Sequence, residues 1–220
     1  LIETYIFSNT LSDIIRVTRV FKGEMMITDK AKKFENPARL DELSPESTLI
    51  RAGFSEGMSL CDIGAGTGIF LVAAARISSA AVNALDISDE MLEIMRRKKA
   101  EENLQNLNIL KVHSEELPLE SGSCDFAIMV TVLHEIEDRD SMLKEIKRVL
   151  SENGKFLVIE FHKKATPMGP PVDHRIAKET VERLCSGSGF QKLEAFEMGD
   201  NFYGIIFKNM NLCMLWVIFF

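Results

Sequence analysis

From Ser59 onward the sequence alternates short apolar runs with helical patterns, and this alternation constrains the fold more than any other feature. The predicted strands are residues 59–63, 81–87, 107–112, 124–132, 155–161, 191–198 and 202–208. The predicted helices between them are residues 69–78, 89–103, 140–150 and 177–190. Strand–helix–strand units build a mostly parallel sheet through right-handed crossovers. The last two strands have no helix between them, so we predict an α/β, doubly wound, seven-stranded sheet that is mostly parallel with an antiparallel edge strand.

The composition fits one soluble globular domain, with 220 residues of which 46% are hydrophobic. The formal net charge of −7 argues against nucleic acid as a partner, because phosphate binding needs clustered lysine and arginine. The four cysteines are far apart and form no CxxC pair, so we expect no metal site, no disulfide framework and a cytoplasmic setting. No segment reaches the roughly 18 apolar residues of a membrane span, so we expect no stable membrane insertion.

The chain divides into four segments. Residues 1–25 are interpreted as a non-native upstream extension. The codons for Lys22 to Glu24 can form a purine-rich run like a bacterial ribosome-binding site, just before Met25 and Met26; a genuine N-terminal helix is the alternative. Residues 26–58, rich in charge, are predicted to form an N-terminal helical lid segment, and residues 59–210 the ligand-binding domain. The apolar tail, residues 211–220, offers a homodimer contact, with final packing or a membrane-surface contact as alternatives.

The loop after the first predicted strand reads Asp62-Ile63-Gly64-Ala65-Gly66-Thr67-Gly68. Three glycines in five positions let a ligand approach the backbone closely. A dinucleotide fingerprint would need glycine at position 69, where the chain has isoleucine, and a P-loop would need a following Gly-Lys-Ser/Thr. Asp62, two residues before the first glycine, suits a ligand with an ammonium group better than a pyrophosphate.

Asp86 ends the second predicted strand, where an acid accepts hydrogen bonds from both hydroxyls of a ribose. Asp86 could instead cap the following helix, but Ser88 fills that role better. The glycine loop and Asp86 together favour a nucleoside with a cationic appendage and no phosphates. S-adenosyl-L-methionine (SAM) fits this description, since it joins adenosine to a sulfonium and an ammonium group.

Three motifs in order, LCDIGAGTG, ALDISDEML and EIKRVLSENGKFLVIE, resemble those of class I SAM-dependent methyltransferases. The likeness is greatest to the type 11 branch that includes the ubiquinone/menaquinone biosynthesis methyltransferases, and it covers about residues 26–208. The resemblance implies a Rossmann-like fold, SAM as cofactor and S-adenosyl-L-homocysteine (SAH) as product. It also implies transfer of the sulfonium methyl group to a small-molecule acceptor by in-line displacement.

The resemblance further implies a cofactor site made of Asp62, Gly64, Ala65, Gly66, Asp86, Ile87, Met91, Ser114 and Thr131. Gly64 and Gly66 would let the backbone approach the methionine half, with Asp62 near its amino group. Ile87 and Met91 would pack against the adenine, although a methionine at helical spacing is more often part of the core.

Two further cofactor contacts follow from the resemblance. His113 stands where the family usually has an acid, so the backbone N–H of Ser114 is the more reliable contact with the adenine. Thr131 would border the methyl-transfer site at the end of the fourth strand. Its alternative is a place in the strand with no contact to a ligand.

Methyl transfer from a sulfonium needs alignment and exclusion of water, and needs a general base only if the acceptor must lose a proton. The catalytic candidates are His134 and Glu135 after the fourth strand and His162 after the fifth. A structural role for His134 is an equal alternative. Further titratable groups near the second loop are Glu160, Lys163, Lys164, Asp173, His174 and Arg175. We also predict that the loop TPMGPP and the N-terminal DKAKKFENPARL form a lid over the acceptor.

Two other functions stay open on the same fold. One is a SAM- or SAH-binding regulatory module without turnover. The other is an aminopropyl-type transferase, for which Glu135, Glu137 and Asp138 supply acidic groups after the fourth strand. Methylation of RNA or DNA is disfavoured by the net charge and by TVLH in the place of an NPPY-like tetrapeptide.

Overall fold

A computed structural model describes residues 29–113 and 116–210 of the chain. The proposed upstream extension (1–25), Ser114 and the apolar tail (211–220) therefore lie outside the described residues. Within the described part of the chain, no helix has the length and apolar character that crossing a membrane requires.

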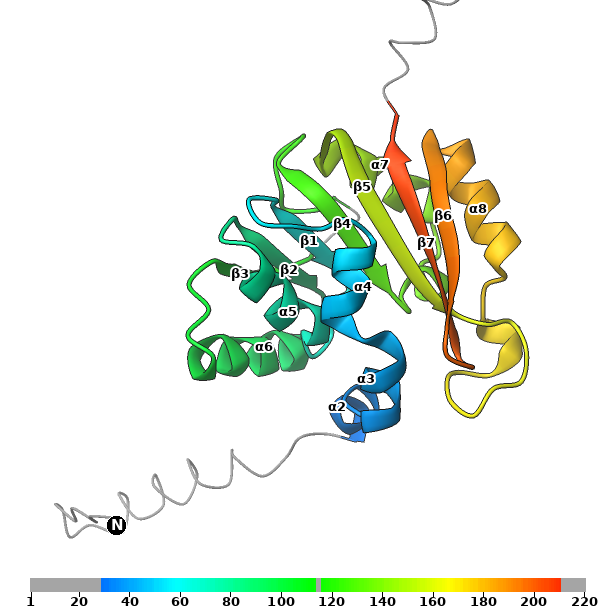
Figure 1. Cartoon of the computed structure of the whole chain (residues 1–220), viewed down its shortest axis with the longest axis horizontal. Coiled ribbons are helices and arrows are strands. Elements are labelled where there is room, and N and C mark those ends of the chain that lie inside the picture. Colours follow the sequence, from blue (N-terminus) through cyan, green and yellow to red (C-terminus); the bar gives the residue numbers. More distant parts are fainter. Residues whose placement is uncertain (1–28, 114–115, 211–220) are drawn as a thin grey trace, which may run out of the picture.

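Seven strands form one sheet in the order β3-β2-β1-β4-β5-β7-β6 (Figure 1). The strands are β1 (Leu60–Ile63), β2 (Val82–Asp86), β3 (Leu107–Lys111), β4 (Cys124–Val130), β5 (Leu150–Phe161), β6 (Phe190–Met198) and β7 (Phe202–Asn209). Strands β1 to β5 run parallel, and β7 runs antiparallel to both β5 and β6. The predicted doubly wound, Rossmann-like sheet is confirmed. The antiparallel strand β7 lies one place inside the edge, which β6 forms.

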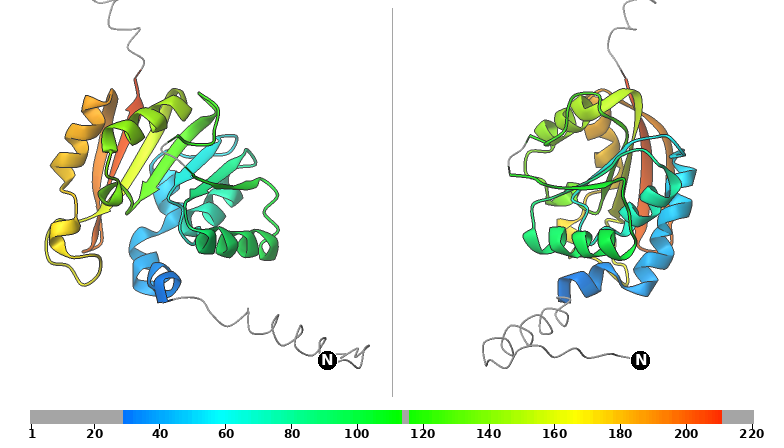
Figure 2. Two further views of the ribbon diagram at one scale, coloured as in Figure 1. Left: turned by 180° about the vertical axis from the view of Figure 1, so that it is seen from behind. Right: turned by 90° about the vertical axis from the view of Figure 1, so that its left-hand side faces the viewer.

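Helices cover both faces of the sheet (Figure 2). One face is covered by α4 (Pro45–Arg51), α5 (Ile69–Ile77) and α6 (Asp89–Glu101), and the other by α7 (Arg139–Val149) and α8 (Lys178–Gly187). The remaining helices are α2 (Asp29–Phe34), α3 (Pro37–Leu43) and two short 3₁₀ turns, η1 (Leu133–Glu135) and η2 (Val172–His174). In Figure 1, α2 and α3 lie below the sheet, at the edge where the parallel strands end.

The core has two layers because the central strands are buried on both faces. Along β5, Leu157, Ile159 and Phe161 join the layer under α4, α5 and α6, while Phe156 and Val158 join the layer under α7 and α8. Alternate side chains of a strand point to opposite faces, so a strand covered on both faces is apolar at successive positions. This explains the unbroken apolar runs of the sequence.

The junction between α7 and β5 differs from the prediction. Gly154 was expected in the C-cap region of the helix, with the strand starting at Lys155. Instead α7 ends at Val149, β5 begins at Leu150, and the left-handed residue is Asn153, with φ 67°. Gly154 has another reason to be glycine, since a Cβ there would lie 3.0 Å from the Ser151 carbonyl oxygen. A register shift in the pairing of β4 with β5 accommodates this stretch.

Candidate functional site

The site lies where the strand order reverses. Strand β1 has β2 on one side and β4 on the other. The chain continues from β1 to β2 and β3 on one side, and then crosses to β4 and β5 on the other. Ligands of open α/β sheets bind in the crevice that this switch creates beyond the carboxyl ends of the strands. The glycine loop leaves β1 at this point, and α2 and α3 lie at the same edge (Figure 1).

The glycine loop needs glycine for both backbone angle and space. Gly64, Gly66 and Gly68 have φ angles of 72°, 56° and 79°, in the region that side chains disfavour. A Cβ on Gly64 would lie 2.6 Å from a methyl carbon of Val132, which follows β4. A Cβ on Gly66 would lie 3.6 Å from the ring of Phe34 at the end of α2. The loop therefore touches both the end of β4 and the N-terminal segment.

Asp86 joins the loops that follow β1 and β2. One of its carboxylate oxygens accepts a hydrogen bond from the Gly66 N–H at 2.8 Å, and the other accepts one from the Ser88 N–H at 2.8 Å. Ser88 in turn is the N-cap of α6 and accepts from the Met91 N–H. The capping role thus belongs to Ser88, as the sequence favoured, and Asp86 presents an acceptor carboxylate beside the glycine loop.

Asp62 is the second carboxyl group of this cluster. Its side chain is buried at the end of β1. Burial, with a smaller contribution from the charge of Asp86, raises the pKa of Asp62 to about 8. A ligand ammonium group beside Asp62 would favour the ionised carboxylate, so binding such a group near neutral pH would be coupled to release of a proton.

Three of the predicted cofactor contacts, Ile87, Met91 and Ala65, fall into different environments. The side chain of Ile87 is 75% exposed after β2, which is unusual for isoleucine and leaves an apolar surface open to a ligand. Met91 is only 2% exposed and packs with Ala31 and Ile94, as the core alternative expects. Ala65 is buried, and its N–H donates to the Leu85 carbonyl. The roles of Ile87 and Met91 toward adenine, and of Ala65 toward the cofactor, stay predictions.

A histidine–glutamate pair forms where β4 and β5 end. The ring nitrogen Nδ1 of His134 lies 2.8 Å from one carboxylate oxygen of Glu160. The backbone N–H of His134 donates a hydrogen bond to the other oxygen at 3.1 Å. Glu160 is fully buried and the His134 side chain is 8% exposed. Burial lowers the pKa of His134, but the hydrogen bond and charge of Glu160 outweigh it and raise that pKa overall. Glu135 is mostly exposed, 3.9 Å from His134 Nε2.

Thr131 and Arg39 meet beside this pair. Thr131 follows β4 with φ 54°, and its hydroxyl accepts a hydrogen bond from Arg39 Nη2 at 3.0 Å. Arg39 belongs to α3, 92 residues earlier in the chain. The predicted lid segment therefore reaches the predicted methyl-transfer position through a side chain that the sequence did not single out.

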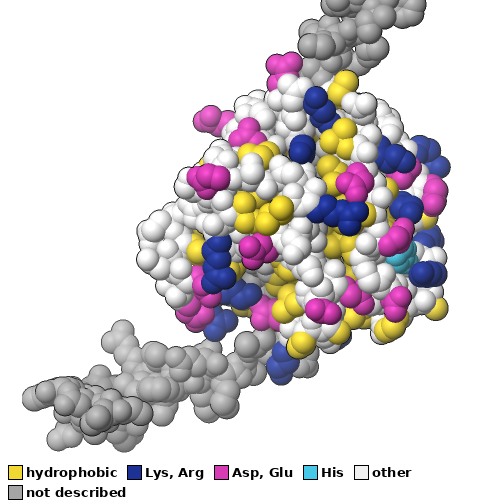
Figure 3. Space-filling view, viewed as in Figure 1, with side chains coloured by type: hydrophobic (Ala, Val, Ile, Leu, Met, Phe, Trp, Pro, Cys, Tyr) yellow, Lys and Arg dark blue, Asp and Glu magenta, His cyan; other side chains and the backbone are white. Residues whose placement is uncertain are grey.

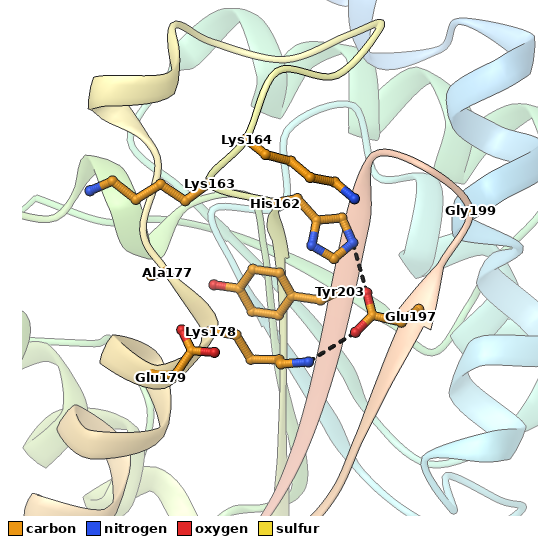
Figure 4. Close-up of a pocket in the computed structure, with 9 residues that line it drawn as sticks. All are labelled: His162, Lys163, Lys164, Ala177, Lys178, Glu179, Glu197, Gly199 and Tyr203. Atoms are coloured by element: carbon orange, nitrogen blue, oxygen red, sulfur yellow. Dashed lines mark hydrogen bonds and ion pairs between the residues drawn. The ribbon is translucent and has the colours of Figure 1, made fainter.

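His162 lies apart from His134. It lines a cavity of about 600 Å³ between the end of β5, the start of α8 and the β6–β7 pair (Figure 4). There His162 Nε2 lies 2.8 Å from Glu197, which also pairs with Lys178 at 2.9 Å. No predicted cofactor-binding residue lines this cavity. The structure thus does not bring His162 together with His134 and Glu135, and its catalytic role stays a prediction.

The loop that follows β5 is organised around a buried arginine. The Arg175 guanidinium donates to the carbonyls of Pro170, His162, Lys164 and Met168 and to the Thr166 hydroxyl. The same loop connects to α3 through Asn201, whose side chain accepts from the Met168 N–H at 3.1 Å and donates to Glu42 at 2.6 Å. Both parts of the predicted lid therefore bond to one buried residue.

Charged side chains are interspersed on the face shown in Figure 3, where acidic and basic groups alternate. Among the described residues, no three histidine, cysteine, aspartate or glutamate side chains gather as metal ligands.

Comparison with known proteins agrees with this geometry. Residues 61–158 match a family described as "Methyltransferase domain". A crystal structure of a SAM dependent methyltransferase from Aquifex aeolicus has a TM-score of 0.77 and 27% identity, over 81% of this chain and 96% of that chain. Residues 61–158 therefore carry a methyltransferase domain of the class I SAM-dependent type. The predicted cofactor, SAM, is thereby confirmed as that of the family.

The similarity to curated relatives covers only part of each relative's length. The ubiquinone/menaquinone biosynthesis C-methyltransferase UbiE of Shewanella halifaxensis (strain HAW-EB4) is 32% identical over 119 residues, 53% of this chain and 47% of that protein. The demethylmenaquinone methyltransferase of Lactococcus lactis subsp. lactis (strain IL1403) is 36% identical over 115 residues, 51% and 46% respectively. The chain thus spans about half the length of these curated relatives.

The methyltransferase fold alone does not fix the reaction. The structure of the [4+2]-cyclase SpnF shares the fold with a TM-score of 0.66, at 19% identity over 76% of this chain. The reaction therefore depends on the side chains at the site.

Substituting Gly64 by alanine is expected to weaken SAH binding strongly. The left-handed backbone alone costs of order 1–3 kcal/mol for a side-chain-bearing residue, and the new Cβ would also collide with Val132. Gly57→Ala is the matched control, because Gly57 has φ 83° but nothing within 4 Å of an added Cβ. Thermal unfolding and calorimetric titration with SAH would separate the two effects. Equal behaviour of the two variants would show that the contact with Val132 is unimportant.

Deleting residues 167–171 is expected to abolish turnover and leave SAH binding largely intact, since Met168 of this loop is linked through Asn201 to Glu42 of the predicted lid segment. Asn201→Ala should act in the same direction more weakly. It removes the bonds to Met168 and Glu42 and leaves a buried group unpaired, at a cost of about 1–3 kcal/mol. Lys163→Ala serves as the control on an exposed side chain. Unchanged turnover in the deletion variant would refute the lid.

Proposed function

We propose that this domain transfers the sulfonium methyl group of SAM to a small-molecule acceptor. The proposal rests chiefly on one arrangement: the glycine loop and Asp86 are hydrogen-bonded to each other at the switch point of the sheet. The His134–Glu160 pair joins the turn after β4, the neighbour of β1, to the end of β5, the next strand along the sheet. This arrangement supports a nucleoside site at the glycine loop with a proton-accepting group at the same edge of the sheet.

The chemistry of the step is a single displacement. The acceptor atom forms a bond to the methyl carbon while the carbon–sulfur bond breaks, and the sulfonium becomes the neutral thioether of SAH. With Nδ1 of His134 held by Glu160, Nε2 is the ring nitrogen that takes up a proton from the acceptor. A carboxylate partner both orients the ring and stabilises the imidazolium that forms.

We further propose a hydroxylated aromatic ring as the acceptor. A base such as His134 is useful where a hydroxyl must lose its proton as the neighbouring carbon or the oxygen attacks. The relatives from Shewanella and Lactococcus bear names that place them in quinone methylation. Demethylmenaquinol and simpler dihydroxynaphthalenes are therefore the first acceptors to try.

The test is a turnover assay with methyl-labelled SAM and a panel of hydroxylated aromatic acceptors. We expect acceptor-dependent formation of SAH and label in the organic product. Binding of SAH without turnover on any acceptor would favour the regulatory module. Release of 5′-methylthioadenosine from decarboxylated SAM would favour aminopropyl transfer, for which Glu135 and Asp138 would supply the acidic groups.

The cellular location and the oligomeric state of the protein are also proposals. We propose a cytoplasmic location, which the scattered cysteines favour, since three of them are free and buried in the described residues. A homodimer rests on the apolar tail, and sedimentation of the whole chain beside a variant ending at residue 210 would test it.

A further inference from the structure

Arg39 is a buried cation at the methyl-transfer edge of the sheet. Its side chain leaves α3 and is 7% exposed. The guanidinium carbon lies 5.9 Å from the ring centre of Phe34, 5.5 Å from that of Phe161 and 5.2 Å from that of Phe202. These rings come from the N-terminal segment, the end of β5 and the start of β7, so three distant parts of the chain meet around this one charge.

The hydrogen bonds of Arg39 are far from saturated. Its guanidinium has five N–H donors. Nη2 donates to the neutral hydroxyl of Thr131, and the buried Nε has no hydrogen-bond partner among the described residues. Arg175 shows what a structural arginine of this fold looks like, because its guanidinium makes five bonds to oxygen atoms. The two residues are about equally exposed to solvent, so solvent exposure does not explain the difference.

The charge of Arg39 is also poorly balanced. Burial lowers its pKa to about 10, and the nearby charge of Glu160 opposes this only in part. Glu160 is already bonded to His134 through both of its oxygens. Aromatic faces compensate a cation by about 0.5–2 kcal/mol, whereas buried charges are normally paired with an opposite charge. Within the described part of the chain, the surroundings of Arg39 thus lack one anion.

We propose that Arg39 binds an anionic oxygen of a ligand in the methyl-transfer site. The inference rests on the proposed function and adds a ligand group to it. Two sources offer this chemistry: the carboxylate of the methionine half of the cofactor, and an acidic oxygen of the acceptor. Both fit the position, because Thr131 borders the switch point and Phe161 ends β5. In either case the anion takes the donors that Arg39 leaves unused.

The first arm of the test compares SAH with 5′-methylthioadenosine, which keeps the nucleoside and thioether but lacks the amino and carboxyl groups. Calorimetric titrations would use the wild type, Arg39→Met and Arg39→Lys. If Arg39 holds the cofactor carboxylate, Arg39→Met weakens SAH binding about 10- to 100-fold, as expected for a bond to a charged group, and leaves 5′-methylthioadenosine unchanged. Arg39→Lys restores part of the loss. Arg51→Met, an exposed arginine of the neighbouring α4, changes neither ligand.

The second arm titrates benzoate, with benzyl alcohol as its neutral match, into the SAH complex. If Arg39 holds an acidic oxygen of the acceptor, the wild-type complex binds benzoate in preference to the alcohol and Arg39→Met loses this preference. The proposal is overturned if Arg39→Met keeps its affinity for SAH and the wild type shows no such preference. It is also overturned if Arg39→Met weakens SAH and 5′-methylthioadenosine equally, since that marks a structural role. A wild type that binds neither nucleoside would instead refute the proposed function.

Discussion

Asp86→Ala is expected to raise the Kd for SAH roughly 30- to 1,000-fold. Two ribose hydroxyls would lose a charged acceptor, and hydrogen bonds to charged groups contribute about 1.5–3 kcal/mol each, or about 2–4 kcal/mol in total after water replaces part of the loss. The Gly66 N–H would also lose its partner, so the glycine loop would be less well held. Calorimetric titration with SAH measures the change.

Asp89→Ala is the matched control for Asp86→Ala. Asp89 is an acid three residues later, with a side chain 79% exposed and paired with Lys111. Its loss should leave the Kd within about twofold, because screened surface pairs contribute little. 5′-Methylthioadenosine should lose affinity for Asp86→Ala by a factor similar to SAH, since it keeps the ribose. Wild-type affinity in a folded Asp86→Ala variant would contradict the assignment of the ribose to this carboxylate.

His134→Ala is expected to lower kcat by about 10²–10⁴-fold, the usual contribution of a general base, without weakening SAH. The raised pKa of His134 gives a second readout. A base must be unprotonated to act, so kcat should rise with pH through a midpoint above the ordinary value of about 6.5. Glu160→Gln should move this midpoint to lower pH, because it removes the negative charge that favours the imidazolium.

His174→Ala is the control for His134→Ala, because His174 is exposed on η2 and should change neither kcat nor its pH profile. The stability of the fold should follow the same linkage. A histidine whose pKa is raised on folding stabilises the protein fully below the unfolded pKa, near 6.5, and loses that contribution as pH rises through the folded pKa. The difference in Tm between wild type and His134→Ala should therefore shrink above neutral pH. If kcat changes neither in His134→Ala nor with pH, His134 has a structural role.

The closeness of the glycine loop and Asp86 was predictable because its signals are local. Strand and helix periods identify the elements, and the loops that follow β1 and β2 place the glycines and Asp86 at the same edge of a parallel sheet. Ser88 could be identified as the cap of α6 for the same reason. Met91 shows the limit of such arguments, since helical spacing predicts a buried face without saying what covers it.

The acceptor half was less predictable because its contacts join distant segments. His134 and Glu160 were both candidates, but only the parallel pairing of β4 with β5 brings them within 2.8 Å. His162, two residues after Glu160, instead lies beside Glu197 of β6 because β7 and β6 pack on that side of β5. No local pattern marks Arg39, whose importance comes from rings and a hydroxyl elsewhere in the chain.

The sequence by itself determined the α/β architecture and the likeness to methyltransferases, and it predicted a nucleoside-binding loop, because periodicity, turn chemistry and the order of motifs are properties of short stretches. The tertiary structure alone decided which titratable groups lie together and which buried charge has no opposite charge of its own among the described residues. Those properties depend on distance and burial, and a chain acquires both only when segments tens of residues apart pack against one another.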